Sequence, residues 1–224
     1  MQTLWQDLQY ALRQLRKQPG ITATILLMLG LGIGATTALF TVVNAVLLRP
    51  LPYRQPEQLV YVKEELERGI VSPYAVAHEY LAWRERQTTL SQIAAYNSFR
   101  ANLTGGDQAE RIICGKATAS FFPLLGVQPL LGRGFLPADE LTQNAAPMLL
   151  SFDLWNRRFG KDAAVLGKAL TLNGARYTII GVLPANFLLP DRFAFSAGEN
   201  YDASIPFQPS EAAQSAPVLL RVIG

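Results

Sequence analysis

The longest apolar run of the chain lies near its N-terminus. No charged residue occurs from Ile21 to Leu48, and this stretch exceeds the roughly 20 residues that a helix needs to cross the hydrocarbon core of a bilayer. A cleavable signal peptide would have an apolar region of about 7 to 15 residues followed by small residues, whereas this stretch ends in Leu47-Leu48-Arg49-Pro50. The pattern therefore predicts a transmembrane helix over residues 19–48.

A shorter, amphipathic pattern precedes this run. Between residues 2 and 17, apolar residues recur at helical spacing and polar residues occupy the other faces, which is typical of a helix that lies in the membrane interface. We expect such a helix over residues 1–18 on the cytoplasmic side, with Gln18-Pro19-Gly20 breaking it before the span; a disordered leader is the alternative. The residues predicted to lie at the interface, aromatic ones at headgroup level and basic ones near anionic lipid, are Trp5, Tyr10, Arg13, Arg16 and Lys17.

Basic residues also predict the orientation of the span. Arg13, Arg16 and Lys17 precede it, and Arg49 and Arg54 follow it. Because positive charge is enriched on the cytoplasmic side, the excess before the span predicts a cytoplasmic N-terminus. The rest of the chain is then periplasmic, attached to the cell inner membrane.

Small residues recur along one face of the predicted span. Gly30, Gly34 and Ala38 are spaced every four residues, an arrangement that lets a second membrane helix approach closely. Gly30 to Gly34 is not a dinucleotide-binding loop, because no strand precedes it and its surroundings are apolar. We expect the partner helix to belong to another chain or to sequence beyond this one.

A domain of mixed strands and short helices follows the span. Prolines make residues 49–56 an extended linker, and residues 57–224 form a periplasmic α+β core domain that we expect to continue past Gly224. Strands are predicted over 59–63, 93–102, 110–117, 147–151, 169–172, 176–183, 204–207 and 218–223, and helices over 72–87, 120–125 and 153–159. In this scheme Ser72 caps the first helix, with Pro73 at its first position, and Asn173-Gly174 turns a hairpin.

Composition narrows the possible functions. The chain has 224 residues, half of them hydrophobic, and a formal net charge of +3. No basic run is present, so the sequence lacks the footprint of a nucleic-acid-binding protein. Cys114 is the single cysteine, so no internal disulfide forms, and its apolar surroundings predict a small core residue.

The residues that could carry chemistry favour no enzyme. His78 is the only histidine and is expected on a helix as a surface or packing residue. Asp139 and Glu140 are adjacent, which indicates a solvated turn rather than a catalytic carboxylate pair. Gly115-Lys116 ends no phosphate-binding loop, because Glu110 and Ala117 stand where that motif needs glycine and serine or threonine. Catalytic, cofactor-binding and metal sites are therefore not predicted.

Arg157-Arg158 is the remaining candidate for ligand binding. The pair could bind an acidic group, but it ends a predicted helix, where basic residues oppose the negative end of the helix dipole. A solvated helix end is the expectation.

Several segments together resemble the permeases of the macrolide-exporter (MacB-like) type, which carry a periplasmic core domain behind their first membrane helix, and in particular their large duplicated orphan members. The resemblance covers nearly the whole chain. It rests on residues 7–13 (DLQYALR), 31–40 (LGIGATTALF), 43–53 (VNAVLLRPLPY), 102–106 (NLTGG), 124–129 (LLGVQP), 131–133 (LGR), 154–160 (LWNRRFG) and 172–174 (LNG).

The resemblance implies the membrane half of an ATP-binding-cassette system for export or mechanotransmission. A separate ATPase subunit supplies the energy, and a second permease chain, or the missing C-terminal part of this one, supplies the helices that pair in the bilayer. A periplasmic adaptor is a further candidate partner. The chain departs from the family by having one span where the family has at least four, so we expect no transport by these residues alone.

Two other hypotheses stay open at this point. The single span favours a membrane-anchored periplasmic binding or scaffold module that works without ATP. A membrane-anchored hydrolase would have to use residues such as His78 and Asp139, and only the size of the domain supports it.

Overall fold

The computed structural model describes residues 13, 16–43, 53, 55–66, 69–105, 109–142, 144–190, 200–213 and 218–224. The chain divides into two compact units, Met1–Pro50 and Leu51–Gly224, each considered by itself below. Trp5, Tyr10 and most of the predicted interfacial helix and linker lie outside the described residues. Arg13, Arg16 and Lys17 have helical backbone.

The first unit contains one long apolar helix, α2 (Pro19–Val43). Its segment Pro19–Val42 has a mean hydropathy of 2.1 and is long and apolar enough to cross a membrane. Gln18 is not helical, as expected, but Pro19 and Gly20 belong to α2 rather than to a break, because proline at the first helical position loses no intrahelical hydrogen bond. Residues 44–48 of the predicted span lie outside the described part.

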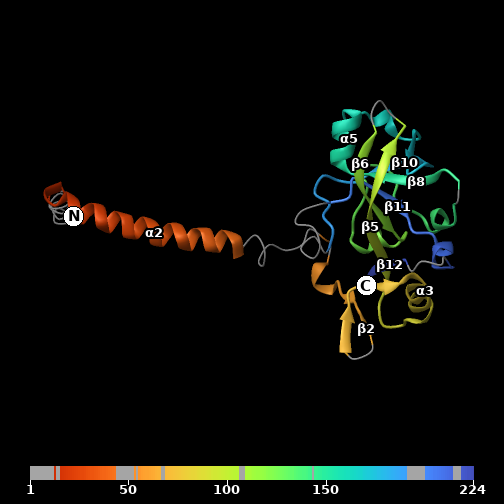
Figure 1. Ribbon diagram of the computed structural model, residues 1–224, viewed down its shortest axis with the longest axis horizontal. Helices are drawn as coiled ribbons and strands as arrows, with labels where there is room; N and C mark the ends of the chain where they lie inside the picture. The colour runs from red at the N-terminus through yellow and green to blue at the C-terminus, as the bar shows by residue number, and fades with distance from the viewer. Residues whose placement is uncertain are drawn as a thin grey trace, which may run out of the picture. The chain divides into compact units, whose positions relative to one another are not determined.

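The second unit opens with short strands and a helix (Figure 1). These elements are η2 (Pro56–Gln58), β1 (Tyr61–Val62), β2 (Glu64–Leu66), β3 (Ile70–Ser72), β4 (Ala75–Val76) and α3 (Ala77–Arg86). The predicted helix cap at Ser72 is wrong. The Ser72 hydroxyl bonds both the N–H and the carbonyl of Tyr74, and β4 pairs with β12, so α3 begins five residues later.

The remaining elements alternate strands with short helices, as the sequence predicts for an α+β domain. They are β5 (Ala94–Thr104), β6 (Glu110–Ala117), α4 (Phe121–Leu124), β7 (Leu131–Gly132), η4 (Pro137–Leu141), β8 (Ala146–Leu150), α5 (Phe152–Phe159), η5 (Ala163–Val165), β9 (Ala169–Leu172), β10 (Ala175–Val182), β11 (Ala203–Pro206), η6 (Pro209–Ala213) and β12 (Leu219–Ile223).

Strand pairing closes part of the sheet into a ring. β5 pairs with β6, β6 with β11, β11 with β8, β8 with β10, β10 with β9, and β9 returns to β5. β9 and β10 form the hairpin predicted at Asn173-Gly174. β12 continues the sheet on the outer edge of β5 and links it to β1 and β4.

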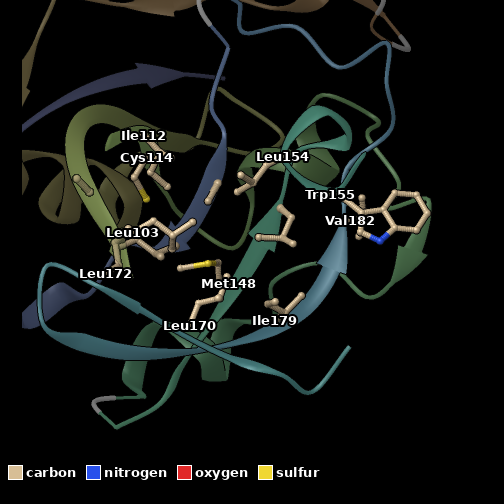
Figure 2. Close-up of a cluster of buried hydrophobic side chains, with 14 of the residues drawn as sticks. Leu103, Ile112, Cys114, Met148, Leu154, Trp155, Leu170, Leu172, Ile179 and Val182 are labelled. Atoms are coloured by element: carbon tan, nitrogen blue, oxygen red, sulfur yellow. The ribbon is translucent and has the colours of Figure 1, made fainter. Parts of the chain in front are cut away.

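The interior of this barrel is filled by apolar side chains. Figure 2 shows side chains of β5, β8, β9 and β10 gathered in this interior, namely Leu103, Met148, Leu170, Leu172 and Ile179; all five are at most 3% exposed. Cys114 belongs to the same cluster and is fully buried, so the expectation of a small core residue is confirmed.

Two further clusters pack outside the barrel. In one of them, Phe121 and Phe122 of α4 bring their rings together, Phe121 contacts Tyr96, and Phe122 also meets Phe135 and Phe187.

A third cluster joins α3 to β12 through Tyr80, Phe207 and Leu220. The second unit therefore holds its helices against the sheet with cores of its own.

Candidate functional site

The surface of α2 is the first candidate site. None of its apolar window is buried, and Leu31, for example, is 72% exposed. Burying such a surface is favourable only in lipid or against another helix. Gly30, Gly34 and Ala38 fall on one side of α2, and a Cβ added at either glycine would meet no atom within 4 Å. The face formed by these three small residues, called the packing stripe below, is therefore not covered by any described residue.

Hydroxyl groups on α2 mostly serve their own helix. Thr36 donates to the carbonyl of Gly32 and Thr41 to that of Thr37, each at 2.8 Å. Such bonds within one turn satisfy a hydroxyl in an apolar environment. The hydroxyl proton of Thr41 is therefore not available to a second helix.

Asp139 and Glu140 do not form the solvated turn expected from the sequence. Both are buried in η4, with 8% and 7% exposure, because each has a cationic partner. Asp139 accepts two bonds from Arg133, at 2.6 and 3.1 Å, and one from the Leu136 N–H at 2.8 Å. Burial alone would raise the pKa of Asp139, but the Arg133 guanidinium and the Leu136 N–H together hold it below its usual value.

Glu140 joins η4 to α3 and to the turn before α4. Its carboxylate accepts from Arg84 of α3 at 3.1 Å and from the Ala119 N–H at 2.7 Å. A buried carboxylate with a charged partner and a backbone donor is a structural connection. The sequence pattern did not reveal this burial, because Arg84 is 56 residues from Glu140 and nothing in the pattern shows that the nearby Arg133 folds back onto Asp139.

Arg157 and Arg158 depart in part from their prediction. Arg157 is solvated at the end of α5, with its side chain 41% exposed, but it also bonds Glu110 at 2.7 Å and Asp202 at 2.8 Å. Arg158 is only 14% exposed and lies 3.5 Å from Glu110. Asp202 in turn accepts from the Ile113 N–H at 2.9 Å. The arginines therefore connect α5 to β6 and to the start of β11, and their charge is already neutralised.

The residues considered for chemistry are not brought together. His78 is exposed on α3, whereas Asp139 is held by Arg133 in η4. Within the described ranges, no group of three or more histidine, cysteine, aspartate and glutamate side chains is arranged to hold a metal ion. Gly115 and Lys116 lie inside strand β6, and the ring of Tyr201 covers Gly115, so they form no phosphate-binding loop.

One mouth of the barrel is polar, a feature that no pattern in the sequence predicted. Lys116 of β6 forms an ion pair with Glu211 of η6 at 2.5 Å, with side chains 19% and 12% exposed. The Lys116 ammonium also lies 5.6 Å from the centre of the Phe99 ring. Hollows of about 300 and 590 Å³ lie on the two sides of this pair. Its partners are 95 residues apart, so no local pattern could reveal them.

Comparison with known proteins tests the family resemblance predicted from the sequence. The family model described as the MacB-like periplasmic core domain matches residues 22–221, which include α2 from its fourth residue and nearly all of the second unit. The chain belongs to this family. The predicted resemblance to macrolide-exporter permeases is thereby confirmed, as is the α+β class behind one N-terminal apolar helix.

Solved structures agree with the family match at the level of the fold. The extracellular domain of the noncanonic ABC-type transporter YknZ from Gram-positive bacteria is 16% identical, with a TM-score of 0.51 over 73% of this chain and 80% of that one. The periplasmic region of MacB from Actinobacillus actinomycetemcomitans is 12% identical, with a TM-score of 0.52 over 74% and 72%.

A domain assigned to a permease protein from Porphyromonas gingivalis is 18% identical, with a TM-score of 0.56 over 76% of both chains. At these identities the likeness concerns the fold. A search of curated proteins gave no significant match.

Proposed function

We propose that the chain is a noncatalytic permease subunit, or the N-terminal part of one, of an ATP-binding-cassette export or mechanotransmission system. The observation that carries this proposal is the extent of the family match, which runs from the apolar helix through the folded domain. Helix and domain are thus parts of one family unit. The ABC-type transporter named among the similar structures supports the same assignment.

In this proposal a separate ATPase supplies the energy and the periplasmic domain transmits motion. The closed barrel and the ion pairs of Glu140 and Arg157 support such a role, because a densely packed body moves as a unit rather than deforming. The chain's own residues then bear force and make contacts, and they carry out no chemical step.

The proposed membrane arrangement follows the segments of the chain. Residues 1–18 lie on the cytoplasmic face, 19–48 span the inner membrane, 49–56 link, and 57–224 form the periplasmic core. The stripe of Gly30, Gly34 and Ala38 would receive a helix of a second permease chain or of this chain's continuation. A periplasmic adaptor is a further proposed partner.

A second candidate is an anchored periplasmic binding or scaffold module that works without ATP. The observation favouring it is that the second unit has its own closed barrel and hydrophobic clusters. Such a unit needs α2 only as an anchor.

A copurification experiment distinguishes the permease subunit from the anchored module. The tagged full chain would be extracted from native membranes in mild detergent with ATP and vanadate, and its partners quantified by mass spectrometry. We expect enrichment of an ABC ATPase, reduced by Gly34→Ile and retained by Gly32→Ile on the opposite face of α2. A chain that remains monomeric with no ABC ATPase, while an exported fragment from Tyr53 onward restores the phenotype of a deletion strain, would establish the anchored module instead.

A further inference from the structure

The polar mouth of the barrel combines features of a ligand site. Strands β6, β8, β10 and β11 end or begin around the smaller hollow, which is lined by Lys116, Ala146, Tyr177 and Pro206 among others. Barrel mouths are common ligand sites, and the two hollows fall at the lower and middle part of the usual size range. Burial, with Cys114 and Glu211 nearby, raises the pKa of Tyr177, so its phenol remains a hydrogen-bond donor.

Backbone strain occurs beside the same hollow. Ala145, at the entrance to β8, lines it and has a φ of 49°. This left-handed conformation is unfavourable for a residue with a Cβ and is found most often at functional positions. It independently marks this end of the barrel.

Among the described residues, the outer edge of β5 has no strand partner between Tyr96 and Leu103, next to the larger hollow. β12 pairs with β5 only from Ala94 to Tyr96, and β9 only at Leu103 and Thr104. The Asn102 N–H and carbonyl bond Asn173, on the side away from β6. Because main-chain groups alternate along a strand, those of Ser98 and Arg100 point the same way, and their strand partners among the described residues lie only in β6.

An added strand would place side chains in defined positions. A residue opposite Phe99 would turn its side chain to the face of Phe99, above which the Lys116 ammonium lies. Asn97, which lines the larger hollow, donates its side-chain N–H to the Leu219 carbonyl of β12 at 3.1 Å. Its side-chain oxygen has no hydrogen-bond partner among the described residues. Three to five residues, at about 3.3 Å each, would fill the opening between β12 and the β9–β10 turn.

The charges around this opening are mainly positive. Arg100 is exposed and has no ion pair within the described part of the chain, and Arg176 lines the smaller hollow. Arg221 lines the larger hollow, where it donates to the Tyr74 hydroxyl at 3.0 Å. Glu211 is the acidic residue that lines both hollows, and Lys116 already neutralises it. Electrostatic complementarity therefore favours an acidic occupant.

We propose that the barrel mouth binds an extended acidic peptide segment of a partner protein. The segment pairs with the free edge of β5 at Ser98 and Arg100, and one of its carboxylates replaces Glu211 on Lys116. Glu211 thus occupies the site as an internal ligand until the segment displaces it. This proposal goes beyond coupling to an ATPase and does not depend on it.

Peptide titration of the full chain in nanodiscs tests the site. The probe is acetyl-Thr-Val-Glu-Val-Thr-amide, compared with its glutamine analogue and with an analogue N-methylated at both valines. We expect saturable binding of the glutamate peptide, at least about tenfold weaker binding of the glutamine analogue because a charge-assisted bond is lost, and no binding of the methylated one. Succinate, which has carboxylates but no peptide backbone, tests binding of a carboxylate without strand pairing. It should bind far more weakly than the glutamate peptide.

Protein variants make the test specific. Glu211→Gln removes the competing carboxylate and should tighten binding about fivefold or more, whereas Lys116→Gln should weaken it by a similar factor. Arg111→Gln, at an exposed position of the same strand, is the matched control and should bind like the parent. Glu211→Gln that binds no tighter, equal binding of the glutamate and glutamine peptides, or no saturation by 1 mM peptide would each overturn the proposal. The peptide comparison keeps the test valid if Lys116→Gln does not fold.

Discussion

At the residue scale, partners distant in sequence decide what a side chain does. Glu140 has the sequence context of a solvated turn, but it is buried and pairs with Arg84, 56 residues away. Arg157 would be an ordinary helix-end residue without Glu110 and Asp202. Cys114, by contrast, was placed correctly in the core because its neighbours in the chain already show the apolar pattern of a buried strand.

The Asp139 carboxylate makes the stability of the folded chain depend on pH. Its pKa in the folded chain is lowered, so its contribution is complete above its unfolded value of about 3.9 and is lost as pH falls through the folded value. Asp139→Asn should lower the melting temperature at pH 7, and the difference from the parent should shrink toward pH 3. Thermal unfolding of the full chain in detergent measures this, with Glu85→Gln at an exposed position of α3 as control. A difference that stays constant with pH would contradict the role assigned to this ion pair.

Gly115 should tolerate no side chain. A Cβ there would overlap the ring of Tyr201, and that ring is held by the bond from its hydroxyl to the Asn97 carbonyl at 2.9 Å. Gly115→Ala should destabilise the domain by about 1–3 kcal/mol, the usual cost of overpacking a core. In the control Gly134→Ala the nearest atom is 3.8 Å away. Similar melting temperatures for the two variants would show that Tyr201 moves freely.

At the element scale, turn and cap residues in the sequence predicted the elements whose ends depend on neighbouring residues alone. The β9–β10 hairpin follows from Asn173-Gly174, whose two residues both have positive φ. Helix α5 begins after Ser151, which accepts from the Leu154 N–H at 3.0 Å. The start of α3 was wrong because β4 is fixed by β12 at the other end of the chain, and a cap motif carries no information about that pairing.

Helix α2 permits a matched test of its predicted packing face. Gly30, Gly34 and Ala38 share one face, and Gly32 points to the opposite one. Gly34→Ile should reduce association of the span about fivefold, equivalent to about 1 kcal/mol, because close backbone approach is lost. Gly32→Ile adds the same side chain elsewhere and should leave association unchanged. Resonance energy transfer between labelled chains in vesicles measures this, and equal loss in both variants would remove the stripe as the interface.

At the scale of the whole molecule, the class of fold was predictable and the closure of the barrel was not. Alternating strands, short helices and one apolar run indicate an α+β domain behind a membrane helix. The closing contact between β5 and β9 joins residues far apart in sequence through only two paired positions. The polar mouth depends on that closure, so its binding residues could not be assembled before the strand order was known.

Orientation in the membrane is the remaining prediction at this scale, and the chain provides its own control. Burial raises the pKa of the Cys114 thiol, and the side chain is inaccessible, so the parent should resist maleimide until it is denatured. Gln18→Cys, just before α2, and Arg111→Cys, on β6, each add one exposed thiol. In intact spheroplasts an impermeant maleimide should label Arg111→Cys at once and Gln18→Cys only after permeabilisation. The reverse pattern would place the folded domain in the cytoplasm, because α2 is the one span found in the described residues, and the proposed membrane arrangement of the permease would then fail.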